Sequence, residues 1–278
     1  MGADIKSLRT RIKSVDSTMH LTKAMGLVAS SKIRRATINM NQSRQYVQAV
    51  DAAVATLLSS PDCARSPFLA DRAQGTEQVR THLVVIAGDR GLAGGYNANI
   101  FRLIRNTFGT DVTISPIGKR ACDRYGQGVP SAEKFTRVEA QELATRLCDG
   151  FLAGEYDRVG IVWTEYVSMM TQKATVSWIL PLQKEQLLKD ATQTGGSVIF
   201  EPDEITILNL SVREYVAGHL HAAVRESFAS EVAARRCAMD SAGKNAQEMI
   251  DELQLEYNSA RQGAITQELT EIVAGANA

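Results

Sequence analysis

The segment GDRGLAGGYN, residues 88–97, contains the residues best placed for ligand chemistry. It follows an apolar run at residues 81–88 that is typical of a buried strand, and a helical pattern capped by Asn97 continues from it to Phe108. A glycine turn between a strand and a helix N-terminus offers backbone N–H groups to an anion. The chemistry that such a pattern would perform is the binding of a phosphate group.

The glycine spacing, however, fits neither of the common phosphate-binding patterns. The segment reads GxxGxxGG, whereas those patterns are GxGxxG and GxxxxGK[ST], and no Lys-Ser or Lys-Thr pair stands in it to bind phosphate and magnesium. Gly91, Gly94 and Gly95 are better explained as a tight turn against the sheet or a neighbouring element. Asp89 and Arg90, at the exposed lip of the turn, are then expected to contact another protein.

Other reactive side chains form no catalytic or metal-binding pattern. We expect no catalytic residues, no cofactor, no metal and no nucleic acid, since the chain has no GxSxG motif and no CxxC spacing. The cysteines are expected to be reduced thiols because they are scattered and no export signal precedes them. These residues are Cys63, Cys122, Cys148 and Cys237, and the four histidines, His20, His82, His219 and His221, are equally unclustered.

Short strand and helix patterns alternate in the middle of the chain, between residues 61 and 202. Strands are predicted at 81–88, 112–118, 157–167 and 171–182, with helices at 97–108 and 138–152. The last two strands are close enough for a hairpin with its turn near residues 168–170. The order predicts a small, mostly parallel sheet with one antiparallel edge strand, and residues 59–78 and 183–202 are predicted to be linkers.

All six prolines lie between Pro61 and Pro202, so both terminal segments lack the residue that most reliably breaks a helix. The N-terminal segment also carries an unbroken 3-4 repeat, which predicts a left-handed coiled coil. The positions of this seam are Ile5, Leu8, Ile12, Val15, Met19, Thr22, Gly26, Ala29, Ile33, Ala36, Met40, Ser43, Val47, Val50, Val54 and Leu57. We therefore predict a helix at about 5–58 and another from about residue 205 to the C-terminus.

Charge favours pairing of the two terminal helices. Residues 1–60 hold nine Lys or Arg against three Asp, a balance of +6, and residues 203–278 hold six basic against twelve acidic residues, a balance of −6. An antiparallel pair places the basic helix beside the acidic one, and Gly218, Gly243 and Gly263 would fit a close partner. The predicted segments are thus 1–60, 61–202 and 203–278.

Three stretches of the chain resemble the gamma subunits of F-type ATP synthases. The bacterial members of this family are the most similar. The three stretches are DIKSLRTRIKSV with LTKAMGLVASSKIRRA near the N-terminus, GDRGLAGGYN, and the C-terminal AMDSAGKNAQEMIDELQLEYNSARQGAITQELTEIVAGA. The resemblance covers essentially the whole chain. It implies an α/β fold with long helices: an antiparallel two-helix coiled coil formed by both termini plus a small Rossmann-like α/β domain.

The resemblance also implies a mechanical function. The chain would be a non-catalytic central-stalk rotor subunit, transmitting torque between the membrane rotor ring and the catalytic hexamer of a proton-translocating ATP synthase. Its partners would be the alpha and beta subunits, the epsilon subunit and the membrane c-ring, with one copy per complex. No apolar run of 18 residues is present, so we expect a peripheral protein on the cytoplasmic side of the bacterial inner membrane.

Residues of both helices match family positions that contact other subunits. Lys23 and Met25 are similar to the segment facing the beta subunits. Arg235 and Gln262 are similar to residues coupled to that segment. The longer C-terminal helix is expected to extend 15 to 20 residues, estimated from a helical rise of about 1.5 Å, beyond its partner. The contact residues implied there are Arg261, Gln262, Ile265, Thr266 and Leu269, of which Ile265 and Leu269 lie on an apolar stripe.

Two other functions remain open on the residues alone. One is a nucleotide-binding enzyme whose glycine segment holds a phosphate and whose helices dimerise. The other is a cytoskeletal or scaffold coiled coil. Magnesium-dependent binding of ATP or ADP would indicate the enzyme, and failure to associate with alpha and beta subunits would exclude the rotor.

Overall fold

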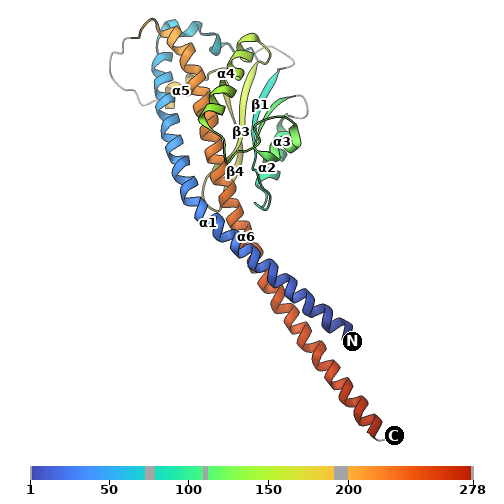
Figure 1. The fold of residues 1–278 in the computed structure, drawn as a ribbon. Helices are drawn as coiled ribbons and strands as arrows, with labels where there is room; N and C mark the ends of the chain where they lie inside the picture. The colour runs from blue at the N-terminus through green and yellow to red at the C-terminus, as the bar shows by residue number, and fades with distance from the viewer. Residues whose placement is uncertain (1, 73–78, 109–111, 191–199, 277–278) are drawn as a thin grey trace. The chain divides into compact units, whose positions relative to one another are not determined.

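The computed structural model describes residues 2–72, 79–108, 112–190 and 200–276 (Figure 1). The chain forms two compact units, one of Met1–Ser30 with Arg235–Ala278 and the other of Ser31–Ala234. Two long helices, α1 (Gly2–Leu58) and α6 (Glu204–Ala276), contribute to both units. The predicted segments 1–60, 61–202 and 203–278 follow the ends of these helices, whereas the compact units divide each helix.

The predicted seam of α1 is confirmed along its length. Each of its sixteen positions, from Ile5 to Leu57, is buried or half-buried, and charged residues such as Lys6 and Lys13 are exposed. A continuous helix of this length satisfies its own backbone, so the apolar seam alone needs a partner. The absence of proline and the 3.5-residue repeat therefore predicted both the extent and the buried face of α1.

In the first unit, α1 and α6 pack antiparallel. A Cβ added at Gly26 would lie 3.5 Å from the Cβ of Met239, and one added at Gly243 would lie 3.8 Å from Oγ1 of Thr22. Residue numbers fall along one helix as they rise along the other. Gly263 differs from the prediction, because no atom lies within 4 Å of an added Cβ there.

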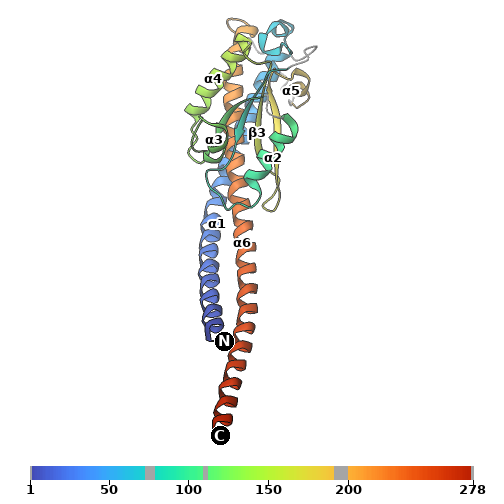
Figure 2. The ribbon, with the colours of Figure 1, turned by 90° about the vertical axis from the view of Figure 1, so that its right-hand side faces the viewer.

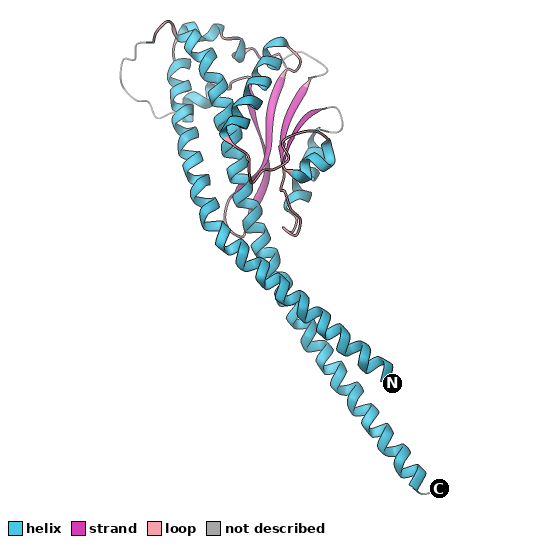
Figure 3. Cartoon of the chain, viewed as in Figure 1, coloured by secondary structure: helices cyan, strands magenta, loops and turns pink. Residues whose placement is uncertain are grey.

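The second unit contains a four-stranded sheet in the order β2-β1-β3-β4, drawn in magenta in Figure 3. The strands are β1 (Thr81–Ile86), β2 (Thr113–Ile117), β3 (Arg158–Tyr166) and β4 (Gln172–Leu180). β1 pairs in parallel with β2 and β3, while β4 pairs antiparallel with β3 as an edge strand. The predicted mostly parallel sheet with its terminal hairpin is confirmed.

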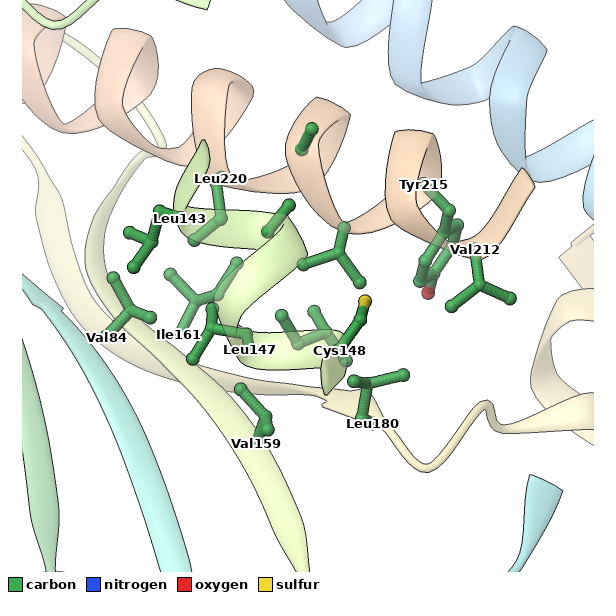
Figure 4. Close-up of a cluster of buried hydrophobic side chains, with 14 of the residues drawn as sticks. Val84, Leu143, Leu147, Cys148, Val159, Ile161, Leu180, Val212, Tyr215 and Leu220 are labelled. Atoms are coloured by element: carbon green, nitrogen blue, oxygen red, sulfur yellow. The ribbon is translucent and has the colours of Figure 1, made fainter. Parts of the chain in front are cut away.

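Alternating side chains of the strands give the sheet two apolar faces. Val84 and Ile161 point to one face, where α4 (Arg137–Ala153) and α6 cover them, as Figure 4 shows. Leu83 and Val85 point to the other face, against α2 (Tyr96–Phe108) and α3 (Lys119–Tyr125), which are labelled in Figure 2. Burial on both faces explains the continuous apolar sequence of β1.

The two predicted linkers are partly structured. Residues 59–78 include 3-10 helices at Pro61–Arg65 and Pro67–Leu69, and the Cys63 and Phe68 side chains are fully buried in the core. Residues 183–202 include α5 (Lys184–Asp190). The linker prediction was therefore wrong for these stretches, because single apolar residues within a polar composition anchor them; residues 73–78 and 191–199 lie outside the described residues.

Candidate functional site

The glycine segment, residues 88–97, forms a tight turn between β1 and α2. The turn includes two residues with positive φ, Leu92 at 59° and Gly94 at 56°. Asn97 joins the ends of the turn: its Oδ1 accepts a hydrogen bond from the Gly88 N–H at 2.9 Å, and its Nδ2 donates to the Arg90 carbonyl at 3.3 Å. The predicted helix cap at Asn97 was wrong, since its side chain bonds the preceding turn and not the first turn of α2.

Asp89 is half-buried, and its carboxylate is occupied by the protein itself. The two oxygens accept one hydroxyl and three backbone N–H hydrogen bonds. The donors are the Ser131 hydroxyl at 2.6 Å and the N–H groups of Ala132 at 2.8 Å, Glu133 at 3.2 Å and Lys119 at 3.2 Å. Asp89 therefore joins the glycine turn to the loop before α4, and only Arg90 of the predicted pair is exposed.

Glycine at position 88 permits close approach of a buried carboxylate from α6. A Cβ added at Gly88 would lie 2.7 Å from Cδ of Glu231, a residue that is only 3% exposed. The carboxyl group of Glu231 fills the space next to Gly88 that a phosphate on this turn would need. The structure thus favours the tight-turn interpretation of the glycines over nucleotide binding.

A second contact between the sheet and α6 involves the free edge of β3. Pairing of β3 with β1 ends at Val162, whereas β3 itself continues to Tyr166. In that extension the Thr164 N–H donates to Oγ of Ser227 at 3.2 Å, and the Thr164 carbonyl accepts from Oγ of Ser230 at 3.0 Å. Two serines of α6 thus satisfy strand groups that a neighbouring strand would otherwise pair.

The same edge of β3 forms further hydrogen bonds at Tyr166, two residues after Thr164. The Tyr166 N–H donates to Oε1 of Glu226 at 3.0 Å, and Arg44 of α1 donates to the Tyr166 carbonyl at 3.4 Å. Arg44 also pairs with Glu226 at 2.6 Å. We call Arg44, Glu226, Ser227 and Ser230, with the backbone of residues 164 and 166, the edge clamp.

The hydroxyl of Tyr96 connects the edge clamp to the glycine turn. It donates to the Ser227 carbonyl at 3.0 Å and lies 2.9 Å from the Ser227 Oγ. Ser227 and Ser230 are fully buried, and Glu226 is 9% exposed. Because buried hydrogen bonds are directional and costly to break, the edge clamp fixes the sheet on both long helices.

Sequence reasoning did not identify the edge clamp. The available signal was the run Glu226 to Glu231, where polar side chains occupy the buried face of an otherwise apolar helix. Such residues need hydrogen-bond partners. Their partners are backbone groups of a strand, which no side-chain pattern reveals.

The predicted contact residues of the first unit lie on both helices. Lys23 is exposed, while Met25 and Arg235 are half-buried. The pairing of Gly26 with Met239 and of Thr22 with Gly243 places residue 235 opposite residue 30, slightly more than one helical turn from Met25. The structure thus brings Met25 and Arg235 into one region, whereas the same register puts Gln262 opposite residue 3, about six helical turns from Met25.

The remaining predicted residues lie together on the C-terminal part of α6. Arg261, Gln262 and Thr266 are exposed, and so are Ile265 and Leu269, at 44% and 58%. The register of the first unit pairs residue 2 with residue 263, so α6 continues beyond the last possible partner position of α1. The described helix ends at Ala276, 13 residues past position 263 and fewer than the 15 to 20 predicted, and its extension leaves an apolar stripe uncovered.

Burial causes the largest pKa shifts in the second unit. Burial raises the pKa of the Cys148 thiol to about 12 and lowers the pKa of His82 to about 4. Within the described residues, no three His, Cys, Asp or Glu side chains gather as metal ligands. Over the same residues, no helix is long and apolar enough to cross a membrane.

The fold and the edge clamp define a class of protein: a two-helix antiparallel coiled coil whose helices are bonded to a small α/β domain. The chain belongs to the ATP synthase family, whose model matches residues 4–278. It is 38% identical to the ATP synthase gamma chain of Ruminococcus albus over 97% of this chain and 96% of that one. It is 35% identical to the sodium ion specific ATP synthase gamma chain of Acetobacterium woodii, over 100% of this chain and 99% of that one.

Solved structures share the fold. A chain of the Euglena gracilis mitochondrial ATP synthase, in an OSCP/F1/c-ring assembly, superposes with a TM-score of 0.69 and 20% identity, covering 100% of this chain and 95% of that one. A chain of the rotor of the same enzyme gives a TM-score of 0.63 with 18% identity, covering 95% and 100%. Long terminal helices with a small α/β domain are therefore an architecture of ATP synthase assemblies.

Proposed function

We propose that this chain is the central-stalk rotor subunit of an ATP synthase and transmits torque between the membrane rotor ring and the catalytic alpha and beta subunits. The observation that carries the proposal is the edge clamp, which bonds the α/β domain to both long helices in the second unit. A torque-transmitting part must resist rotation of one element about another. Directional bonds from two helices to one strand provide that resistance, which an apolar contact alone does not.

The three segments take separate roles in this proposal. Residues 1–60 and 203–278 form the coiled coil that acts on the catalytic subunits, and residues 61–202 form the α/β domain that contacts the rotor ring and the epsilon subunit. Each complex holds one copy. The chain supplies no catalytic group, and it works as a peripheral protein on the cytoplasmic side of the bacterial inner membrane.

The exposed apolar stripe of α6 supports contact with the catalytic subunits. Ile265, Leu269 and Ile272 are 44%, 58% and 67% exposed, which is unfavourable in water unless a partner surrounds them. We propose that Arg261, Gln262 and Thr266 contact the alpha and beta subunits beside this stripe. Lys23, Met25 and Arg235 form a second contact region. Arg90 forms a third, together with the half-buried Asp89 next to it.

Association with the catalytic subunits tests the proposal. A tagged chain is expressed in its host and purified, and the bound proteins are identified by mass spectrometry. We expect alpha, beta and epsilon subunits and the c-ring in stoichiometric amounts. Recovery of the tagged chain without alpha and beta subunits would refute the assignment.

A further inference from the structure

A basic cleft lies beside the seam of α1 and α6 in the second unit. Its volume is about 520 Å³, and it is lined by Arg35, Asn39 and Gln42 of α1, by His221 and Arg225 of α6, and by Arg137 at the start of α4. A second hollow of about 380 Å³ shares Arg35, Asn39 and Arg225 with it. Neither hollow includes the glycine segment or the edge clamp's serines.

Arg225 contributes a positive charge that pairs with no carboxylate in the described part of the chain. Its guanidinium donates to the carbonyls of Phe135 and, at 3.4 Å, of Glu133, and its Nε donates to Nε2 of His221 at 3.2 Å. Among the described residues, none of the ion pairs of the chain includes Arg225. Burial, and then the neighbouring Arg225, lower the pKa of His221 to about 4, so this imidazole is neutral near pH 7 and accepts the bond.

Arg35 adds a second charge without a counter-ion. Its side chain is exposed at the edge of the cleft, and it has no hydrogen bond or ion pair with any residue that the structure describes. The other cations nearby are already paired: Arg137 with Glu214, and Lys32 with Glu133 at 2.6 Å. The cleft therefore holds two guanidinium groups in excess of its carboxylates.

We propose that this cleft binds a phosphate group, as free phosphate or as the phosphate of a small molecule. Guanidinium groups present paired N–H donors that match the oxygens of phosphate, and Asn39 and Gln42 offer neutral amide donors beside them. A charge as deep as that of Arg225 gains more from an anion than a surface arginine does, since solvent screens it less. The cleft is large enough for a phosphate with part of the molecule that carries it.

Calorimetric titration of the purified full-length chain tests this proposal, with inorganic phosphate, pyrophosphate and ADP as probes. Magnesium is left out, and the salt concentration is low. We expect binding of one pyrophosphate per chain that weakens as salt is raised. A phosphate response equal to that of pyrophosphate indicates free phosphate as the ligand, and a stronger ADP response indicates a nucleotide; both support the site.

Arginine variants locate the binding. Arg35→Gln should weaken pyrophosphate binding about tenfold, because one charge-assisted contact of about 1.4 kcal/mol is lost. Arg34→Gln is the matched control, since Arg34 is its exposed neighbour on α1 and does not line the cleft. Arg225→Lys serves as a second variant that keeps the charge but loses the planar donors, and circular dichroism verifies its fold.

Two results would overturn the proposal. The first is the absence of any heat of binding with all three probes at millimolar concentration. The second is binding that Arg35→Gln and Arg34→Gln weaken equally, which would show a diffuse attraction to the basic helix and no site in the cleft. Neither result bears on the association with alpha and beta subunits, so the rotor proposal is tested separately.

Discussion

Ser227→Ala removes the central hydroxyl of the edge clamp, and we expect it to destabilise the chain well beyond an ordinary helix substitution. The hydroxyl oxygen accepts the Thr164 N–H at 3.2 Å and lies 2.9 Å from the Tyr96 hydroxyl, with Ser227 fully buried. Without it the Thr164 N–H, on the free edge of β3, has no strand to pair with. A buried donor left in that state costs about 1–3 kcal/mol.

The better helix propensity of alanine offsets part of this loss, by about 0.5 kcal/mol. The Tyr96 hydroxyl keeps its bond to the Ser227 carbonyl, so it adds little to the loss. The expected net decrease in the free energy of unfolding is therefore about 0.5–2.5 kcal/mol.

Urea denaturation of the full-length chain, followed by circular dichroism, measures the decrease. Ser241→Ala is the matched control because Ser241 is exposed on the same helix, where alanine should be neutral or slightly stabilising. In the assembled complex, Ser227→Ala should also lower ion pumping per ATP hydrolysed. If both variants have the same unfolding midpoint, the edge clamp contributes no stability and the reasoning fails.

Three further variants test other parts of the structure. Met25→Lys should leave the complex assembled while reducing pumping per ATP hydrolysed, and an unchanged ratio measured in membrane vesicles would contradict a contact at this position. Leu269→Glu should change the stability of the chain by less than about 0.5 kcal/mol, because the side chain is 58% exposed, yet it should weaken assembly with alpha and beta subunits in co-purification; equal recovery would argue against the contact. His82 has a pKa of about 4 in the folded chain, below its ordinary 6.5. Its contribution to the stability of the fold is therefore present above pH 6.5 and is lost as the pH falls toward 4. Between pH 7 and 5 this loss is about 2 kcal/mol of the free energy of unfolding. In urea titrations at several pH values, His82→Phe should reduce the pH dependence of that free energy by the same amount. An unchanged pH dependence would contradict the prediction.

The sequence predicted those parts of the fold that depend on periodic burial. The 3-4 repeat from Ile5 to Leu57 identified the buried face of α1 residue by residue, because a seam requires only apolar side chains at regular spacing. The all-apolar run of β1 and the short turn at 168–170 were equally sufficient for the sheet. Each of these features is local, so a single stretch of sequence contains the whole signal.

The sequence did not predict the parts that depend on backbone groups of distant elements. Asp89 looked like an exposed lip residue, yet its four donors come from residues 119 to 133. Glu226 and Ser227 likewise bond backbone groups of β3, 60 and 63 residues away in the sequence. Which strand ends early, and which N–H is left unpaired, is a property of the assembled sheet.

The edge clamp also explains how the register of α6 against the sheet is unique, although its apolar seam would tolerate a shift by a helical turn. Thr164 and Tyr166 are two strand residues apart, about 6.6 Å, and Ser230 and Glu226 are four helical residues apart, about 6 Å. The two spacings match, so both pairs of bonds form together. A shift by one turn would put Ala222 and Ala223 in place of Glu226 and Ser227. Buried backbone groups of β3 would then be unpaired. The edge clamp therefore excludes registers that the apolar seam permits.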